Sequence, residues 1–162
     1  MTAFRLPALC LVSCLAAAVV APGASAFDLT GTWEGRWSCQ GFDGAKFRSG
    51  NSQSIVLITQ TGTTLAVNMD NGDYLYNGAA IFDTASPDTK GEVVLTQCGT
   101  DNLPLAGADS EILRAKAKAD AEKGSGSLKG LSIFESAVPD IITCKYSYKR
   151  TSAANPAVPA CP

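Results

Sequence analysis

The sequence predicts an all-β fold, an eight-stranded antiparallel up-and-down barrel, from three observations. Apolar and polar residues alternate over many short runs, which is the period of a half-buried strand. Turn signals rich in Gly, Asn, Asp and Pro separate these runs, as in an antiparallel meander. The first and last runs can pair as antiparallel strands that bring two cysteines opposite each other. A sheet whose first and last strands pair is closed, so a barrel is expected.

Segments 31–39 and 142–150 are the two strands expected to close the barrel, because both alternate without interruption. Pairing them antiparallel with Cys39 opposite Cys144 sets three further cross-strand pairs: Trp37 with Tyr146, Gly35 with Tyr148, and Trp33 with Arg150. Directly opposed residues of neighbouring strands lie within disulfide reach. This register therefore predicts a Cys39–Cys144 bridge.

Six further runs lie between these two segments and complete the strand count: 54–60, 63–69, 74–82, 92–98, 110–123 and 127–134. A long polar loop is expected over 41–51, at one mouth of the barrel. Asn71-Gly72 favours a tight hairpin, because both residues accept positive φ angles. Asp70 and Asp73 beside it lack the spaced oxygens of a calcium loop and are read as turn residues.

Segment 110–123 fits both a strand and a short helix. Its composition has high helix propensity, with Ser110 as a candidate N-cap and Gly124 as a candidate C-cap. However, alanines alternate with charged residues from Leu113 to Glu122, which is the period of a strand. We favour the strand, because tertiary context often overrides propensity, and keep the helix as the alternative.

The chain is expected to comprise a signal peptide (1–26), a barrel domain (27–150) and a C-terminal tail (151–162). Arg5 precedes an apolar run over 6–20, and Ala24-Ser25-Ala26 offers a cleavage site for signal peptidase. The protein is therefore expected to be secreted or periplasmic. A membrane anchor and lipidation at Cys14 are the alternatives to cleavage.

Four cysteines remain after residue 26, and in an exported protein an even number indicates disulfides. Once Cys39 is assigned to Cys144, Cys98 is left to Cys161, and this second bridge would pin the tail to the barrel. Metal ligation is the competing interpretation, although the chain has no CxxC spacing and no histidine. The net charge is small and its signs are interspersed along the chain, so neither nucleic acid nor membrane is expected as a partner.

Gly31-Thr32-Trp33 at the start of the first strand and Arg150 at the end of the last resemble the calycin superfamily of lipocalins and avidins. The resemblance implies a ligand-binding barrel whose base is closed by Trp33, packed by Arg150. Avidin-type biotin binding would need an Asn and a Ser where this chain has Gly35 and Cys39, and further tryptophans besides Trp33 and Trp37. The resemblance therefore does not extend to biotin.

A non-catalytic carrier of a small amphipathic ligand is the expected function, with no cofactor. The absence of histidine removes the usual general base and the Ser-His and Cys-His nucleophiles. Inward aromatic residues with hydroxyl tips would suit such a ligand or simply fill the core: Trp37, Tyr74, Tyr76, Tyr146 and Tyr148. A protein-binding barrel, such as an exported protease inhibitor acting through 27–29 or 41–51, is the first alternative. An unrecognised enzyme is the second.

Overall fold

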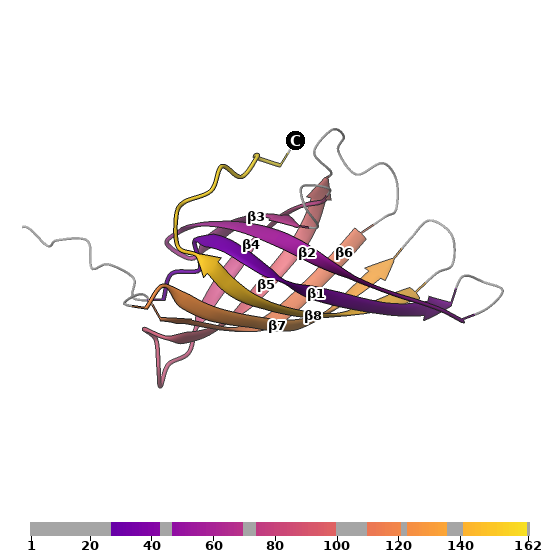
Figure 1. Ribbon diagram of the computed structural model, residues 1–162, viewed down its shortest axis with the longest axis horizontal. Helices are drawn as coiled ribbons and strands as arrows, with labels where there is room; N and C mark the ends of the chain where they lie inside the picture. The colour runs from indigo at the N-terminus through magenta and orange to yellow at the C-terminus, as the bar shows by residue number, and fades with distance from the viewer. Residues whose placement is uncertain are drawn as a thin grey trace, which may run out of the picture.

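A computed structural model shows a closed antiparallel barrel in which each strand pairs with the next and β1 pairs with β8 (Figure 1). The structure describes residues 27–42, 47–69, 74–99, 110–120, 123–135 and 141–161. Its strands are β1 (Gly31–Phe42), β2 (Phe47–Thr61), β3 (Thr64–Met69), β4 (Tyr74–Phe82), β5 (Lys90–Gly99), β6 (Ser110–Asp120), β7 (Ser125–Glu135) and β8 (Ile141–Ser152). The predicted all-β, up-and-down barrel is confirmed.

The register that closes the barrel is the predicted one. Cys39 is the cross-strand partner of Cys144, and the three further pairs follow: Trp37 with Tyr146, Gly35 with Tyr148, and Trp33 with Arg150. Cys39 and Cys144 form a disulfide with their Cα atoms 4.0 Å apart. Barrel closure is thus covalently secured, because the bridge joins the first strand to the last.

Segment 110–120 is a strand, so the alternative of a helix there is wrong. β6 pairs with β5 on one side and with β7 on the other. Leu113, Ala115, Ala117 and Ala119 are all buried on its inner face, while the charged residues between them are exposed. Two neighbouring ladders and a buried face outweigh the helix propensity of this composition.

The long loop expected over 41–51 is mostly strand, so that prediction is wrong. β1 continues to Phe42 and β2 already begins at Phe47, and the two pair along this whole length. Residues 49–53 are all exposed, so they lack the alternation by which a half-buried strand is recognised. The predicted Asn71-Gly72 turn lies outside the described residues.

One end of the barrel, here called the base, is closed by buried aromatic residues. Trp33 is completely buried, its Nε1 donates a hydrogen bond to the Leu29 carbonyl at 2.9 Å, and the Arg150 guanidinium lies 5.2 Å from its ring centroid. Phe27 and Leu29 are also fully buried, and the Phe27 ring meets Phe82 edge to face at 5.8 Å. The chain just before β1 therefore folds under the barrel and fills its base.

Inward glycines make room for these rings. A Cβ on Gly126 would lie 2.6 Å from the Trp33 ring, and one on Gly91 would lie 2.9 Å from the Phe27 ring. In the same way Gly35 lies against Tyr148. Small residues on the inner face thus accommodate large neighbours in the base half of the barrel.

The tail crosses the outside of the barrel beside β3 (Figure 1). Thr59 Oγ1 of β2 donates a hydrogen bond to the Pro156 carbonyl at 3.4 Å, and Cys161 is disulfide-bonded to Cys98 of β5. Asn68 and Leu75, cross-strand partners on β3 and β4 between these anchor points, are buried. The predicted second bridge is confirmed, and it fastens the tail across four strands.

Candidate functional site

The end of the barrel opposite the base, here called the mouth, is where the lumen becomes polar. In an up-and-down barrel the last residues of β1, β3, β5 and β7 and the first residues of β2, β4, β6 and β8 all lie at this end, away from Trp33. Five inward residues on successive strands β4 to β8 form a row just inside the mouth: Tyr76, Gln97, Glu111, Ser132 and Tyr146. This set, here called the polar row, is the candidate site.

Glu111 is the centre of the polar row. It is the second residue of β6 and only 6% exposed, yet its carboxylate accepts three side-chain hydrogen bonds. The Tyr76 hydroxyl donates to Oε2 at 2.5 Å, the Tyr146 hydroxyl donates to Oε1 at 2.6 Å, and Ser132 Oγ also donates to Oε1. None of these donors is cationic, so in the described part of the chain the Glu111 carboxylate is held by neutral hydroxyl groups.

Gln97 lies between Tyr76 and Glu111 on the inner wall. It is the cross-strand partner of Tyr76, and because Thr96 pairs with Ile112, Gln97 and Glu111 are the next residues along β5 and β6. Gln97 is 5% exposed, and its Oε1 has no hydrogen-bond partner among the described residues. A buried acceptor without a donor costs roughly 1 to 3 kcal/mol of stability. A hydrogen-bond donor from another molecule would offset that cost by bonding to this oxygen.

The two tyrosines of the polar row are held in their protonated form. Burial, and after it the charge of Glu111 and the hydrogen bond to it, raise the pKa of Tyr76 well above its ordinary value. The same causes raise the pKa of Tyr146. Both phenols are therefore donors to the carboxylate and are unsuited to act as bases near neutral pH. This arrangement of acceptors is able to bind a cation or hydrogen-bond donors.

The aromatic residues predicted to bind ligand are distributed over both halves of the lumen. Tyr76 and Tyr146 belong to the polar row, and Trp37 is half-buried as the cross-strand partner of Tyr146. Tyr148 is buried one step toward the base, where its ring stacks on Tyr146 at 6.2 Å and its hydroxyl shares a 2.8 Å hydrogen bond with Ser54. Tyr74 begins β4 at the mouth and is 39% exposed.

Sequence reasoning missed the polar members of the row, Glu111, Gln97 and Ser132. The signal was nevertheless present, because in a strand over 110–120 Glu111 has the same parity as the inward Leu113 and Ala115. Gln97 likewise has the parity of Leu95 on β5. An acid or amide on the apolar face of a strand is the feature that marks such a site.

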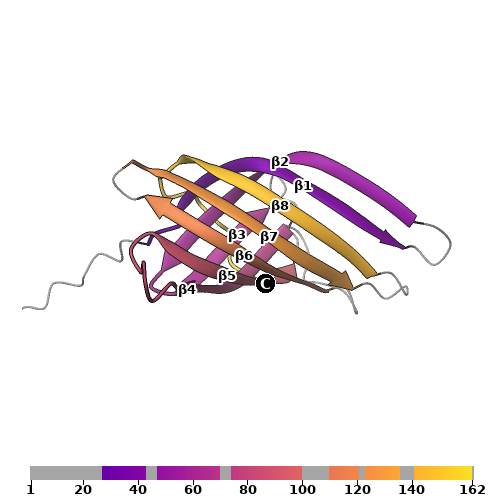
Figure 2. The ribbon, with the colours of Figure 1, turned by 90° about the horizontal axis from the view of Figure 1, so that it is seen from below.

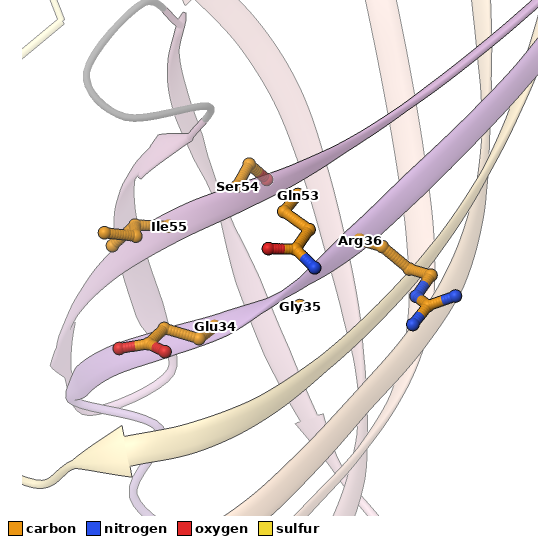
Figure 3. A pocket seen from close by; sticks show the side chains of 6 residues that line it. All are labelled: Glu34, Gly35, Arg36, Gln53, Ser54 and Ile55. Carbon is orange, nitrogen blue, oxygen red and sulfur yellow. The ribbon is translucent and has the colours of Figure 1, made fainter.

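A separate depression of about 490 Å³ lies over β1 and β2 (Figure 3). Its lining combines one acid, one cation, one amide and small or aliphatic residues: Glu34, Gly35, Arg36, Gln53, Ser54 and Ile55. Glu34, Arg36, Gln53 and Ile55 are exposed, which places them on the outside of the barrel wall. Ser54 is instead buried and bonds to Tyr148 in the lumen, so the lining includes residues from both sides of the wall. Its mixed composition selects no ligand class.

Comparison of the chain with protein-family models, curated proteins and solved structures finds no match. Across the described residues, no group of three or more Cys, Asp or Glu side chains is placed to hold a metal ion. No helix in the described ranges is long and apolar enough to cross a membrane. The two disulfides are typical of proteins from an oxidising, extracellular compartment.

Proposed function

We propose that this protein is an exported, calycin-like carrier that binds a small amphipathic molecule in the mouth half of its barrel, and that the ligand carries a protonated amine. The observation that carries the proposal is the Glu111 carboxylate, buried inside the lumen and contacted by no cationic group among the described side chains. Removing a carboxylate from water costs several kcal/mol, and charged groups kept in such places often belong to functional sites.

The surroundings of Glu111 supply the remaining contacts for such a ligand. An ammonium group has three donors, so it can bond to Glu111 and also to the partnerless Oε1 of Gln97. The apolar part of the ligand then has aromatic neighbours, with Trp37 opposite Tyr146 on the adjoining strands. Ionic and aromatic contacts within one lumen favour a molecule with a cationic end and an apolar body.

Native mass spectrometry of the protein purified from its own export compartment is the first experiment. A stoichiometric small-molecule mass that disappears on denaturation is expected, and its formula should contain a basic nitrogen. If no small molecule is bound in any preparation, titration with added ligands decides the proposal.

The direct assay titrates the protein with octylamine, octanol and octanoate while following tryptophan fluorescence. Octylamine is expected to bind more tightly than octanoate by at least about tenfold, because only the amine neutralises a buried carboxylate. Glu111→Gln should remove this preference. Glu92→Gln is the matched control, since Glu92 lies on the outer wall, where it forms an ion pair with Arg114. Equal binding of the amine and the acid, or an unchanged preference in Glu111→Gln, would refute the proposal.

Protein binding is the second candidate function, and the far end of the β1–β2 hairpin favours it. Phe42 and Phe47 face each other there with ring centroids 5.6 Å apart, and Phe47 is 83% exposed. Exposed aromatic pairs are typical of protein contact sites. In contrast, Phe27 and Leu29 are buried in the base, which removes them from the contact surface that an inhibitor segment would need. Loss of a co-purifying protein in Phe47→Ser would support this second function.

A further inference from the structure

The outer face of β6, β7 and β8 concentrates positive charge that is scattered along the sequence. Figure 2 shows these three strands side by side across the barrel wall. Six of the chain's 13 Lys and Arg residues lie at exposed positions there, here called the basic face: Arg114, Lys116, Lys118, Lys129, Lys145 and Lys149. Segments 112–118, 127–133 and 143–151 contain none of the 15 Asp and Glu residues, and outside the six residues of the basic face the chain carries a net charge of −8.

The register brings these cations close together on neighbouring strands. Lys116 is the cross-strand partner of Lys129, and Ser127 of β7 lies between Lys118 and Lys149. Like charges directly opposed in a sheet are destabilising. Arg114 pairs with Glu92 of β5, whereas the five lysines form no ion pair with any residue in the described ranges. Glu92 of β5 and Glu34 of β1 are the cross-strand partners of Lys116 and Lys149 at the two edges of the face. Cations still outnumber acids across the three strands, so an anionic partner would stabilise the face.

Three large aliphatic side chains are exposed on the same strands. Ile112 and Ile133 are cross-strand partners, and Leu131 lies between Arg114 and Lys145. All three are 58% to 60% exposed. Aliphatic groups are thus interleaved with cations, and no aromatic residue points outward over these segments. Nucleic-acid phosphates would engage only the cations and leave the exposed aliphatic groups without a partner, whereas the headgroup region of a lipid bilayer engages both.

We propose that the basic face docks on the surface of a lipid bilayer that contains anionic lipids. Lysine ammonium groups would contact the lipid phosphates, and Ile112, Leu131 and Ile133 would enter the headgroup region. This combination of clustered Lys and exposed aliphatic residues matches the two attractions that hold peripheral proteins on membranes. Charges of both signs are interspersed along the chain, so their order in the sequence provides no reason to expect a membrane partner. In the folded barrel, strand pairing places the lysines of β6, β7 and β8 on one outer face.

The test is sedimentation of the protein, purified with both disulfides intact, with vesicles of phosphatidylcholine alone or with one-quarter phosphatidylglycerol. Binding is expected only to the anionic vesicles and should fall with added salt. Lys129→Gln with Lys145→Gln should weaken partitioning about 25-fold, since each Lys near an anionic surface contributes about a fivefold factor. Leu131→Ser with Ile133→Ser should weaken it without changing the salt dependence.

The matched control is Thr64→Glu with Asn77→Glu, which lowers the net charge by the same two units at exposed positions of β3 and β4. This control should bind anionic vesicles within about threefold of the unmodified protein. Equal loss in the control and in the lysine variant would show that net charge alone matters and would overturn the proposal. Failure of the unmodified protein to bind anionic vesicles at low salt would overturn it as well, even if an acidic protein were captured instead. Unchanged far-UV and near-UV circular dichroism confirms that each variant is folded.

Discussion

Alkaline pH should weaken this fold steeply through the two tyrosines that donate to Glu111. Burial and the neighbouring carboxylate raise the pKa of Tyr76 and Tyr146 in the folded protein, whereas both ionise near pH 10 once the chain unfolds. Above pH 10 the unfolded state therefore binds fewer protons than the folded state. The free energy of unfolding must then fall as pH rises, and this contribution is fully present below pH 10.

Each such tyrosine lowers the free energy of unfolding by about 1.4 kcal/mol per pH unit above its unfolded pKa. For two of them the loss between pH 8 and pH 11 is about 2.8 kcal/mol, a large share of the roughly 5 to 15 kcal/mol of a typical domain. Urea unfolding followed by tryptophan fluorescence at pH 8, 10 and 11 measures this loss. Tyr76→Phe should reduce the loss by about half, since one of the two groups no longer titrates.

Absorbance at 295 nm reports the same ionisations directly. At least two of the four tyrosines should remain protonated above pH 11 until the tryptophan signal shows unfolding. If all four ionised near pH 10 while the protein was still folded, the hydrogen bonds to Glu111 would be absent and the description of the polar row would be wrong. If Tyr76→Phe lost as much free energy of unfolding between pH 8 and pH 11 as the unmodified protein, the description of the polar row would also be wrong.

Three further changes test the structure elsewhere. Replacing Cys98 and Cys161 with Ser should lower the free energy of unfolding by up to about 4 kcal/mol, because the bridge closes a loop of 63 residues in the unfolded chain. Chemical denaturation measures this loss. Gly126→Ala should be destabilising by about 1 to 3 kcal/mol in the same assay, since its Cβ would lie 2.6 Å from the Trp33 ring, and an unchanged midpoint would contradict the close approach. Arg150→Met should lower the melting temperature by several degrees, because the contact with the Trp33 ring and a hydrogen bond to a backbone carbonyl are lost.

The sequence predicts the closure of this barrel well because strong constraints coincide on two strands. Alternation alone fixes which side chains share a face, and a single assumed pair, Cys39 with Cys144, then fixes the pairs between β1 and β8 from Trp33 to Phe42. The shift that pairs Thr32 with Ser152 does not follow from it. The tail bridge follows by elimination. The outer part of the β1–β2 hairpin could not be found in this way, since residues 49–53 are exposed and carry no alternation.

The candidate site and the basic face were harder to predict because both depend on neighbours from different strands. Glu111 contacts residues that lie 35, 21 and 35 positions away in the chain. Its significance therefore appears only when the registers of β4, β6, β7 and β8 are known together. The lysines of the basic face are likewise separated in sequence and meet only through cross-strand pairing. Parity along each strand marks Glu111 and Gln97 as inward polar residues, but local spacing does not show which residues of other strands they meet or that the lysines lie side by side.

The two halves of the lumen differ in a way that stability alone does not explain. In the base, apolar rings are packed against glycines, and the polar Gln60 is satisfied by backbone partners, accepting from Leu29 N and donating to the Phe27 carbonyl. The same packing could in principle continue to the mouth, because well-packed apolar residues are often as stable as a buried charged group or more stable. The base also buries one charged group, the Arg150 guanidinium, which packs on the Trp33 ring and donates to the Asp28 carbonyl, although its Nε has no partner among the described residues. The mouth holds the Glu111 carboxylate, whose donors in the described part of the chain are all neutral, and the Gln97 amide oxygen, which accepts no hydrogen bond there. A fold already secured by its base and two disulfides can tolerate that cost, which is why we propose the polar row as the binding site.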